Sequence, residues 1–163
     1  GFLDFARALR SLDHISVKLK AIVLGVPLPD EEGDVGKIRD ALNNLGELSW
    51  VEVRGKVSQH DAIQAIQESD IVVLPSFYRS ECQPLSIIQA MCNGKKIVVS
   101  RTPALKATAG EYPAVFVERG VDALTIGLLQ SIDSATCDQY HAYQARLRFS
   151  IALFKSKILK LFS

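Results

Sequence analysis

The chain has 163 residues, a formal net charge of +1 and a hydrophobic fraction of 48%. This length and composition suffice for one domain with a buried core, so the chain is not an intrinsically disordered segment. The balanced charge argues against nucleic-acid binding driven by bulk charge. The three cysteines form no CxxC pair, and neither a signal peptide nor a membrane-spanning apolar run is visible. We therefore expect reduced thiols and a cytoplasmic setting.

The first half of the chain alternates between helical and strand patterns. Apolar residues three and four positions apart over residues 2–12 predict an amphipathic helix, and residues 17–24 follow as a strand. Residues 25–36 hold three Gly, two Pro and four acidic residues, which is typical of a solvated connector. The alternative for this segment is a mobile flap beside a ligand site. Residues 37–45 then predict a helix, and residues 50–54 a short strand.

The second half repeats this alternation. Ser58 is followed three positions later by Asp61, a variant of the capping box, so a helix begins there. The remaining elements are strands predicted at 71–74, 96–99 and 114–117, and helices predicted from Pro84 to a stop at Gly94 and over 122–132. One helix followed by four or five rounds of strand and helix predicts an α/β fold with a doubly wound, Rossmann-like parallel sheet.

The end of the chain differs in charge from the rest. No acidic residue follows Asp138, and five basic residues accompany an apolar set with spacings of four, three, four and three. That apolar set consists of Leu147, Ile151, Phe154, Ile158 and Leu161. The spacing predicts one helix within C-terminal helices at about 138–163. Packing against the sheet or against a partner lobe is the simpler interpretation, and a basic helix lying on an anionic membrane surface is the alternative.

The most informative stretch runs from Ser76 to Gly94. It follows the apolar strand at 71–74, whose ladder ends at Pro75, and it leads through a polar loop into the helix that begins at Pro84. In open parallel sheets, ligands bind beyond the carboxyl ends of the strands. The free amides of the next two residues, Leu85 and Ser86, and the positive end of the helix dipole favour an anion there.

Two polar side chains frame this junction at a specific spacing. Glu81 lies in the loop, and Gln89 lies eight positions later on the helix, followed by Ala-Met. This pattern resembles the E-x7-E motif of the retaining, GT-B-fold glycosyltransferases of glycosyltransferase family 4. The resemblance spans nearly the whole chain. It implies that Glu81 holds hydroxyls of the donor sugar and that position 89 holds the ribose.

The resemblance also implies how the rest of the lobe binds a nucleotide-diphosphate sugar. The base lies against the backbone of Gly55, Lys56 and Val57, although core packing is an equal alternative for Val57. The main-chain amide of Gln83 faces the sugar. Gly1-Phe2 looks like the start of a helix that in this family follows a strand and a loop with an Arg and a Lys. In the strand order that the resemblance implies, this first strand lies mid-sheet, between the strands at 17–24 and 71–74. The strand and an N-terminal acceptor lobe are therefore expected outside residues 1–163.

Three departures from the family pattern affect this site. Gln89 replaces an acid and accepts hydrogen bonds less strongly than a carboxylate. Pro84 replaces a Gly and removes one amide, and Pro103-Ala104 replaces part of a Gly-Gly-x-Pro-Glu run. The departures are consistent with an unusual donor or with a weakened site.

The function that these patterns indicate is the donor-binding half of a glycosyltransferase. The resemblance implies metal-independent transfer, with retention, from a UDP-, GDP- or ADP-linked sugar to a saccharide or a lipid-linked glycan held by the other lobe. This fragment alone is then expected to be inactive, and the enzyme to act in the cytoplasm or at the inner face of a membrane. One alternative is a non-catalytic module that binds a nucleotide sugar or a protein. A flavodoxin-like or receiver-type domain is disfavoured because no acidic pair follows a strand.

Overall fold

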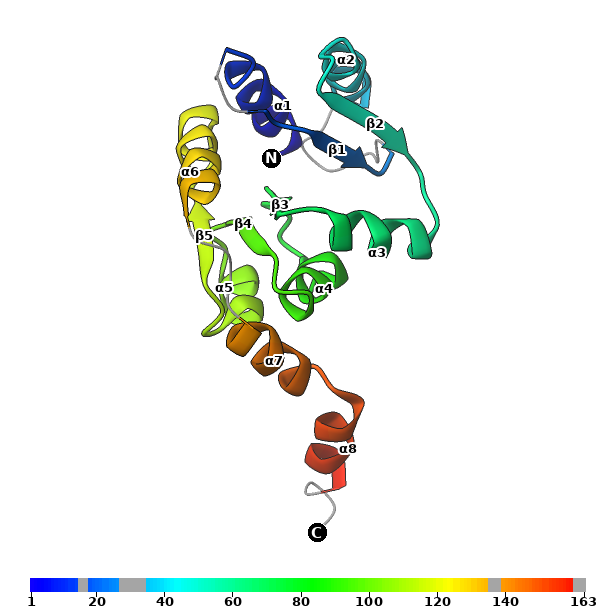
Figure 1. The fold of residues 1–163 in the computed structure, drawn as a ribbon, viewed down its shortest axis with the longest axis vertical. Coiled ribbons are helices and arrows are strands. Elements are labelled where there is room, and N and C mark those ends of the chain that lie inside the picture. Colours follow the sequence, from blue (N-terminus) through cyan, green and yellow to red (C-terminus); the bar gives the residue numbers. More distant parts are fainter. Residues whose placement is uncertain (15–17, 27–34, 135–138, 160–163) are drawn as a thin grey trace.

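The computed structural model describes residues 1–14, 18–26, 35–134 and 139–159 (Figure 1). The helices are α1 (Phe2–Ser11), α2 (Val35–Gly46), α3 (Gln59–Glu68), α4 (Leu85–Cys92), α5 (Pro103–Ala109), α6 (Val121–Asp133), α7 (Gln139–Arg148) and α8 (Ile151–Leu159). The strands are β1 (Ala21–Leu24), β2 (Val51–Gly55), β3 (Ile71–Leu74), β4 (Lys96–Ser100) and β5 (Ala114–Val117). Strands and helices alternate along the chain, so the predicted α/β class is confirmed.

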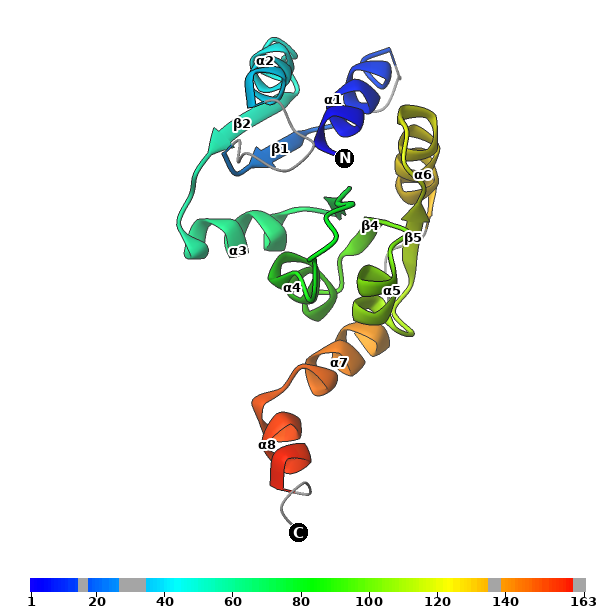
Figure 2. The ribbon, with the colours of Figure 1, turned by 180° about the vertical axis from the view of Figure 1, so that it is seen from behind.

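All strand pairs in the described part of the chain are parallel. β1 pairs with β2, and β4 lies between β3 and β5. Among the described residues, β1 and β3 do not pair with each other, so the sheet is divided into two parts. Figures 1 and 2 show the two parts from opposite sides, with α2 beside β1–β2 and α6 beside β5. The division falls where the family resemblance places a further strand.

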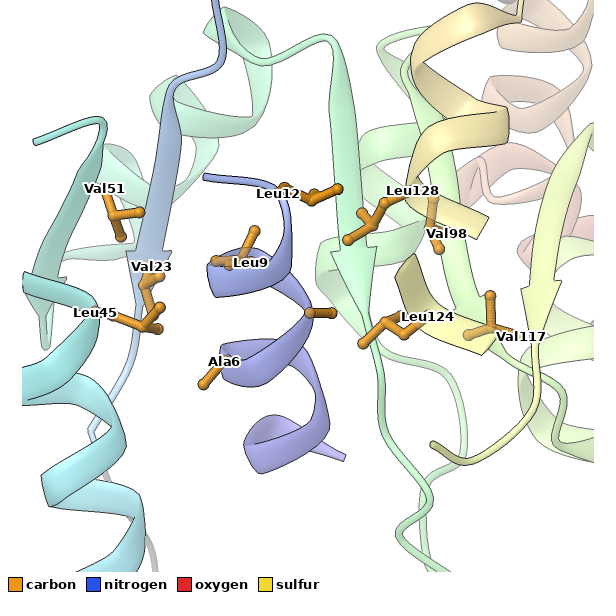
Figure 3. Close-up of a cluster of buried hydrophobic side chains, with 11 residues drawn as sticks. Ala6, Leu9, Leu12, Val23, Leu45, Val51, Val98, Val117, Leu124 and Leu128 are labelled. Carbon is orange, nitrogen blue, oxygen red and sulfur yellow. The ribbon is translucent and has the colours of Figure 1, made fainter. Parts of the chain in front are cut away.

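Helix α1 joins the two parts of the sheet through one apolar core. Its Ala6 and Leu9, and Leu12 at its C-cap, are buried between two sets of side chains (Figure 3). On one side lie Val23, Leu45 and Val51, and on the other lie Val98, Val117, Leu124 and Leu128. Fully burying a side chain of this kind contributes about 1.5–3 kcal/mol. Helix α1 therefore holds together β1 and β3, which do not pair with each other in the described part of the chain.

A second core covers the opposite face of β3–β5. Ile87 and Met91 of α4 and Leu105 of α5 pack there with Ile97 and Val99 of β4, and all of these side chains are nearly inaccessible. Successive residues of β4 therefore point into different cores, as Val98 belongs to the core of α1 and α6. Helices on both faces of a parallel sheet define the doubly wound architecture that the sequence predicted.

Two arginines of helix α7 bind the C-terminal ends of α4 and α5. Arg146 donates from Nε to the carbonyl of Cys92 at 2.7 Å, and Arg148 donates to carbonyls at the end of α5. Ala142 and Ala145 are buried. Leu147, the member of the predicted apolar set that lies on α7, is 45% exposed, so α7 packs through its alanines and arginines and not through that set. None of the described helices has the length and apolarity needed to cross a bilayer.

Several predicted boundaries in the first half of the chain differ from the structure. The strand predicted over 17–24 is confined to β1, because residues 18–20 are not in a strand and residues 15–17 lie outside the described residues. The helix predicted over 37–45 extends one residue further, to Gly46. Most of the predicted connector at 25–36 also lies outside the described residues, and Val35 and Gly36 begin α2.

Three features of the second half differ from the sequence analysis. Pro84 is the N-cap of α4 and not its first helical residue. Helix α5 was not predicted; Thr102 caps it by accepting a hydrogen bond from the amide of Leu105, and Pro103 suits its first turn. The final basic region forms two helices, because Ser150 interrupts it and its Oγ accepts a hydrogen bond from the amide of Leu153 at 3.1 Å.

Candidate functional site

The candidate site lies where β3 ends and α4 begins. Pro84 has an extended backbone with φ −66° and ψ 121°, and its carbonyl accepts hydrogen bonds from the amides of Ile87 and Ile88. The amides of Leu85 and Ser86 have no backbone acceptor among the described residues. Both side chains are exposed. The first turn of α4 therefore presents two free amides and the positive end of the helix dipole, which is suited to an anion.

Glu81 is held in place by a small hydrogen-bond ring in the loop before α4. The hydroxyl of Ser76 donates to Oε2 of Glu81 at 3.0 Å, and the amide of Tyr78 donates to the same hydroxyl at 3.4 Å. The amide of Glu81 donates to the carbonyl of Tyr78 at 3.2 Å. No other hydrogen bond reaches this carboxylate within the described residues. Glu81 is half-buried, so one oxygen is fixed and the other remains available to a ligand.

Sequence reasoning did not identify the role of Ser76. The available signal was its position, because it follows the proline that ends β3 and precedes Glu81 by five residues. A hydroxyl can donate to a carboxylate and accept from an amide at once, which is what this loop requires.

The structure places the other predicted residues of this region as follows. Gln83 is exposed in the loop, and Gln89 is half-buried on α4, one turn after Leu85. The backbone carbonyl of Gln89 accepts a hydrogen bond from Nδ2 of Asn93 at 2.8 Å. The side-chain amide of Gln89 makes no hydrogen bond to another described residue. It is therefore available for a hydroxyl group.

The predicted base-binding segment lies at the carboxyl end of β2. Gly55 has φ +64°, a left-handed conformation that favours glycine, and its carbonyl accepts a hydrogen bond from the amide of Gly25 at 2.8 Å. Lys56 is exposed and Val57 is half-buried. The contact between Gly55 and Gly25 brings the ends of β2 and β1 together. The half-buried position of Val57 is compatible with both core packing and contact with a base.

The start of α1 lies against the candidate loop. A Cβ added to Gly1 would lie 1.6 Å from the carbonyl oxygen of Pro75, so only glycine fits there. Since Pro75 directly follows β3, the N-termini of α1 and α4 both adjoin the carboxyl end of that strand. Gly1-Phe2 is thus a helix start that lies against the segment after β3.

Two arginines at the same edge of the sheet were not identified from the sequence. Arg101 follows β4 and pairs through Nε with Oε1 of Glu118 at 2.9 Å. Arg119 follows β5, and its guanidinium carbon lies 5.0 Å from the centroid of the Phe77 ring. Phe77 belongs to the loop between β3 and α4. The signal for both arginines was their position directly after predicted strands of a parallel sheet.

The most perturbed carboxyl group lies elsewhere on the molecule. Hydrogen bonds from Arg54, and then from Lys20, lower the pKa of Glu52 from 4.5 to about 2. Glu52 lies on β2 and on its exposed surface, away from the loop that holds Glu81. Among the described residues, no group of three or more metal-ligating side chains is assembled.

Comparisons with known proteins identify the class of protein that this fold and site define. The model of the family "Glycosyl transferases group 1" matches residues 1–134. The chain belongs to this glycosyltransferase family. No curated protein matches the chain.

Solved structures of the Anabaena protein HepE have the same fold. The complex of HepE with UDP superposes with a TM-score of 0.70 at 20% sequence identity, covering 99% of this chain and 44% of HepE. The complexes with UDP-glucose and with UDP and glucose give TM-scores of 0.69 and 0.68 at 19% and 20% identity. The chain thus spans less than half the length of the HepE chain. The fold is that of a Rossmann-like lobe of a GT-B glycosyltransferase, as the sequence predicted.

Proposed function

We propose that residues 1–163 form the donor-binding lobe of an enzyme that transfers a sugar from a nucleotide-diphosphate sugar. The observation that carries the proposal is the junction between β3 and α4. There, the hydroxyl of Ser76 holds the Glu81 carboxylate in the loop that leads into the two free amides of α4, in a chain of the group 1 glycosyltransferase family. A carboxylate is an effective acceptor for sugar hydroxyls, and the amides suit a diphosphate.

Different residues of the lobe bind different parts of the donor nucleotide sugar. Glu81 and the amide of Gln83 hold the sugar, and the amides of Leu85 and Ser86 meet the charge that develops on the leaving diphosphate. Gln89 holds the ribose. The backbone of residues 55–57 holds the base, and the contact between Gly25 and Gly55 supports this segment. Pro84 has no N–H to donate to the ligand. Its carbonyl accepts hydrogen bonds from the amides of Ile87 and Ile88 in the first turn of α4.

UDP-linked sugars are the first donors to test. HepE, which shares this fold, was crystallised with UDP, with UDP-glucose, and with UDP and glucose. GDP- and ADP-linked sugars are the alternatives. The reaction proposed for the whole protein is metal-independent and retains the anomeric configuration. The acceptor, a saccharide or a lipid-linked glycan, is held by a second, N-terminal lobe.

The competing function is a binding module without transfer. It is favoured by Gln89, which stands where the family motif has an acid, and by the short helix α5, which begins at Pro103 in place of flexible glycine backbone. The module would bind a nucleotide sugar or a protein partner through the same loop. Binding and turnover therefore have to be measured separately.

Thermal unfolding of the full-length protein with UDP-, GDP- and ADP-linked sugars tests the proposal. A ligand at one hundred times its Kd stabilises the folded state by about 2.7 kcal/mol, which raises Tm measurably. The expected result is a shift with one base, weakened by Glu81→Ala. Release of the free nucleotide in the presence of saccharide acceptors then separates a transferase from a binding module. No shift with any nucleotide or nucleotide sugar would contradict the proposal.

The place of action is a further part of this proposal. A cytoplasmic enzyme at the inner face of a membrane is consistent with a lipid-linked acceptor. Peripheral contact with an anionic membrane remains a prediction for α8, where Ile151 is 72% exposed and Lys155 is exposed. Arg146 and Arg148 are already bonded to carbonyls of the lobe, so they are not counted among its membrane-facing charges.

A further inference from the structure

The loop that carries Glu81 is tied to a distant part of the sheet. Phe77 lies in this loop after β3, and Arg119 lies in the segment after β5. The guanidinium carbon of Arg119 is 5.0 Å from the centroid of the Phe77 ring, which is the geometry of a cation–π contact. Because β4 lies between β3 and β5, the contact bridges two interstrand spacings, about 10 Å.

Phe77 lies in the sequence between the two residues whose hydrogen bonds hold Glu81. Its neighbour Ser76 donates to the Glu81 carboxylate, and its other neighbour Tyr78 donates an amide to Ser76 and accepts the amide of Glu81. Moving Phe77 therefore moves both residues on which Glu81 depends. Phe77 is half-buried, whereas Tyr78 is 58% exposed, so Phe77 is the side chain that anchors this part of the loop.

Arg101, the second arginine at this edge of the sheet, makes different contacts. Arg101 binds Glu118 at 2.9 Å and donates to the carbonyl of Phe116 at 3.2 Å, so it ties β4 to β5. It does not contact the loop through any described interaction. The two arginines are similar in type and exposure, but only Arg119 reaches the Glu81 loop. Arg101 is therefore a matched control.

We propose that Arg119 is a positioning residue for Glu81, acting through Phe77 and Ser76. Arg119 touches no reacting group in this proposal. It keeps the loop in its binding conformation before the donor arrives, so that less ordering is needed on binding. The inference rests on the proposed function in that Glu81 is the residue that grips the sugar.

Hydrogen exchange in the full-length protein tests the positioning part without any ligand. In Arg119→Met and in Phe77→Leu, the amides of Tyr78 and Glu81 are expected to exchange about twofold to thirtyfold faster, the range for losing one cation–π pair. Arg119→Lys keeps the cation and is expected to restore most of the protection. Arg101→Met is expected to leave these amides unchanged. Equal acceleration in Arg101→Met, or none in Arg119→Met, would overturn the proposal.

Calorimetric titration with UDP-glucose and with UDP tests the consequence for the site. Arg119→Met is expected to lower the affinity for UDP-glucose about twofold to tenfold and to leave UDP unchanged, since Glu81 faces the sugar. Glu81→Gln should have the same selectivity. A Glu81→Gln effect without an Arg119→Met effect would overturn the inference and keep the proposed function. If Glu81→Gln leaves UDP-glucose affinity unchanged, the proposed role of Glu81 fails, while the exchange experiment still decides whether Arg119 positions the loop.

Discussion

Replacing Arg148 with methionine should destabilise the protein by detaching α7 from α5. The guanidinium donates to three successive carbonyls at the end of α5: Ala107 at 2.5 Å, Thr108 at 2.8 Å and Ala109 at 3.2 Å. These are carbonyls that a helix cannot satisfy internally, and the cation also faces the negative end of the helix dipole. Methionine keeps most of the apolar stem and removes the charge and all of the donors.

The magnitude follows from these contacts. A hydrogen bond to a charged group contributes about 1.5–3 kcal/mol, but Arg148 is exposed, and its Nη1 divides between two acceptors. A favourable charge at a helix end adds about 0.3–1 kcal/mol. After allowance for solvent screening, we expect a loss of about 1–3 kcal/mol in the free energy of unfolding. For a domain of this size that corresponds to a fall in Tm of about 2–12 °C.

Reversible urea and thermal unfolding of the full-length protein measure the effect, with Lys106→Met as the control. Lys106 lies on the last turn of α5. Lys106→Met therefore removes one positive charge near the same helix end but leaves the donors of Arg148 in place. The control is expected to stay within about 0.5 kcal/mol of wild type. If Arg148→Met and Lys106→Met give equal losses, the carbonyl contacts contribute nothing and the reasoning is refuted. Arg148→Lys should fall between the two, because it keeps a cation and loses the planar fork.

Three further predictions concern individual side chains. Glu81→Ala should cost roughly 2–4 kcal/mol of transition-state binding while sparing free nucleotide, and unchanged steady-state kinetics would contradict this. Gln89→Leu should weaken both the free nucleotide and the nucleotide sugar, whereas Gln89→Glu should be tolerated; unaltered nucleotide affinity in Gln89→Leu would exclude the ribose role. The pKa of Glu52 is lowered to about 2, so its stabilising effect is present above pH 4.5 and is lost as the pH falls from 4.5 towards 2. Glu52→Gln should flatten this part of the Tm profile in dilute buffer, and an unchanged profile would show that the pairs with Arg54 and Lys20 do not stabilise the fold.

The sequence predicted the elements whose signals are local. The strand at 71–74 has the predicted bounds because a run of β-branched residues is limited by a polar residue before it and by Pro75 after it. Ser58 caps α3 as predicted, and its hydroxyl accepts the amide of Asp61 at 3.1 Å. Each of these features depends on neighbours within three or four positions, so a single sequence contains the information.

The misses depend on contacts between distant segments or on a competing local cap. The apolar spacing of Leu147 and Ile151 predicted one continuous helix, but the hydroxyl of Ser150 caps a new helix between them. At the site, Glu81 and Gln89 were recognised by their spacing, whereas the tie between Phe77 and Arg119 spans 42 positions and has no local pattern. Such a contact follows only from the order of the strands in the sheet.

The division of the sheet identifies which backbone groups lack a partner among the described residues. The amide of Ala21 donates to Trp50, directly before β2, and the amide of Gly25 donates to Gly55 at the end of β2. By the alternation of a parallel ladder, the amides of Ile22 and Leu24 therefore point away from β2. The amide of Lys96 donates to the carbonyl of Asp70, which by the same alternation turns the amides of β3 at positions 71 and 73 away from β4.

These four amides should be protected only when another strand lies between β1 and β3. Unpaired edge groups of a buried sheet are costly, so we expect a further strand, from another part of the protein or from another chain, to pair with both edges. In the 163-residue chain alone, the amides of Ile22, Leu24, Ile71 and Val73 should exchange at least about tenfold faster than the paired amides of the same strands. In a protein extended upstream by a strand and a loop with Arg and Lys, they should exchange as slowly as their neighbours. Protection of all four amides in the 163-residue chain would mean that β1 and β3 pair directly, and the assignment of this chain to the family's strand order would then be wrong.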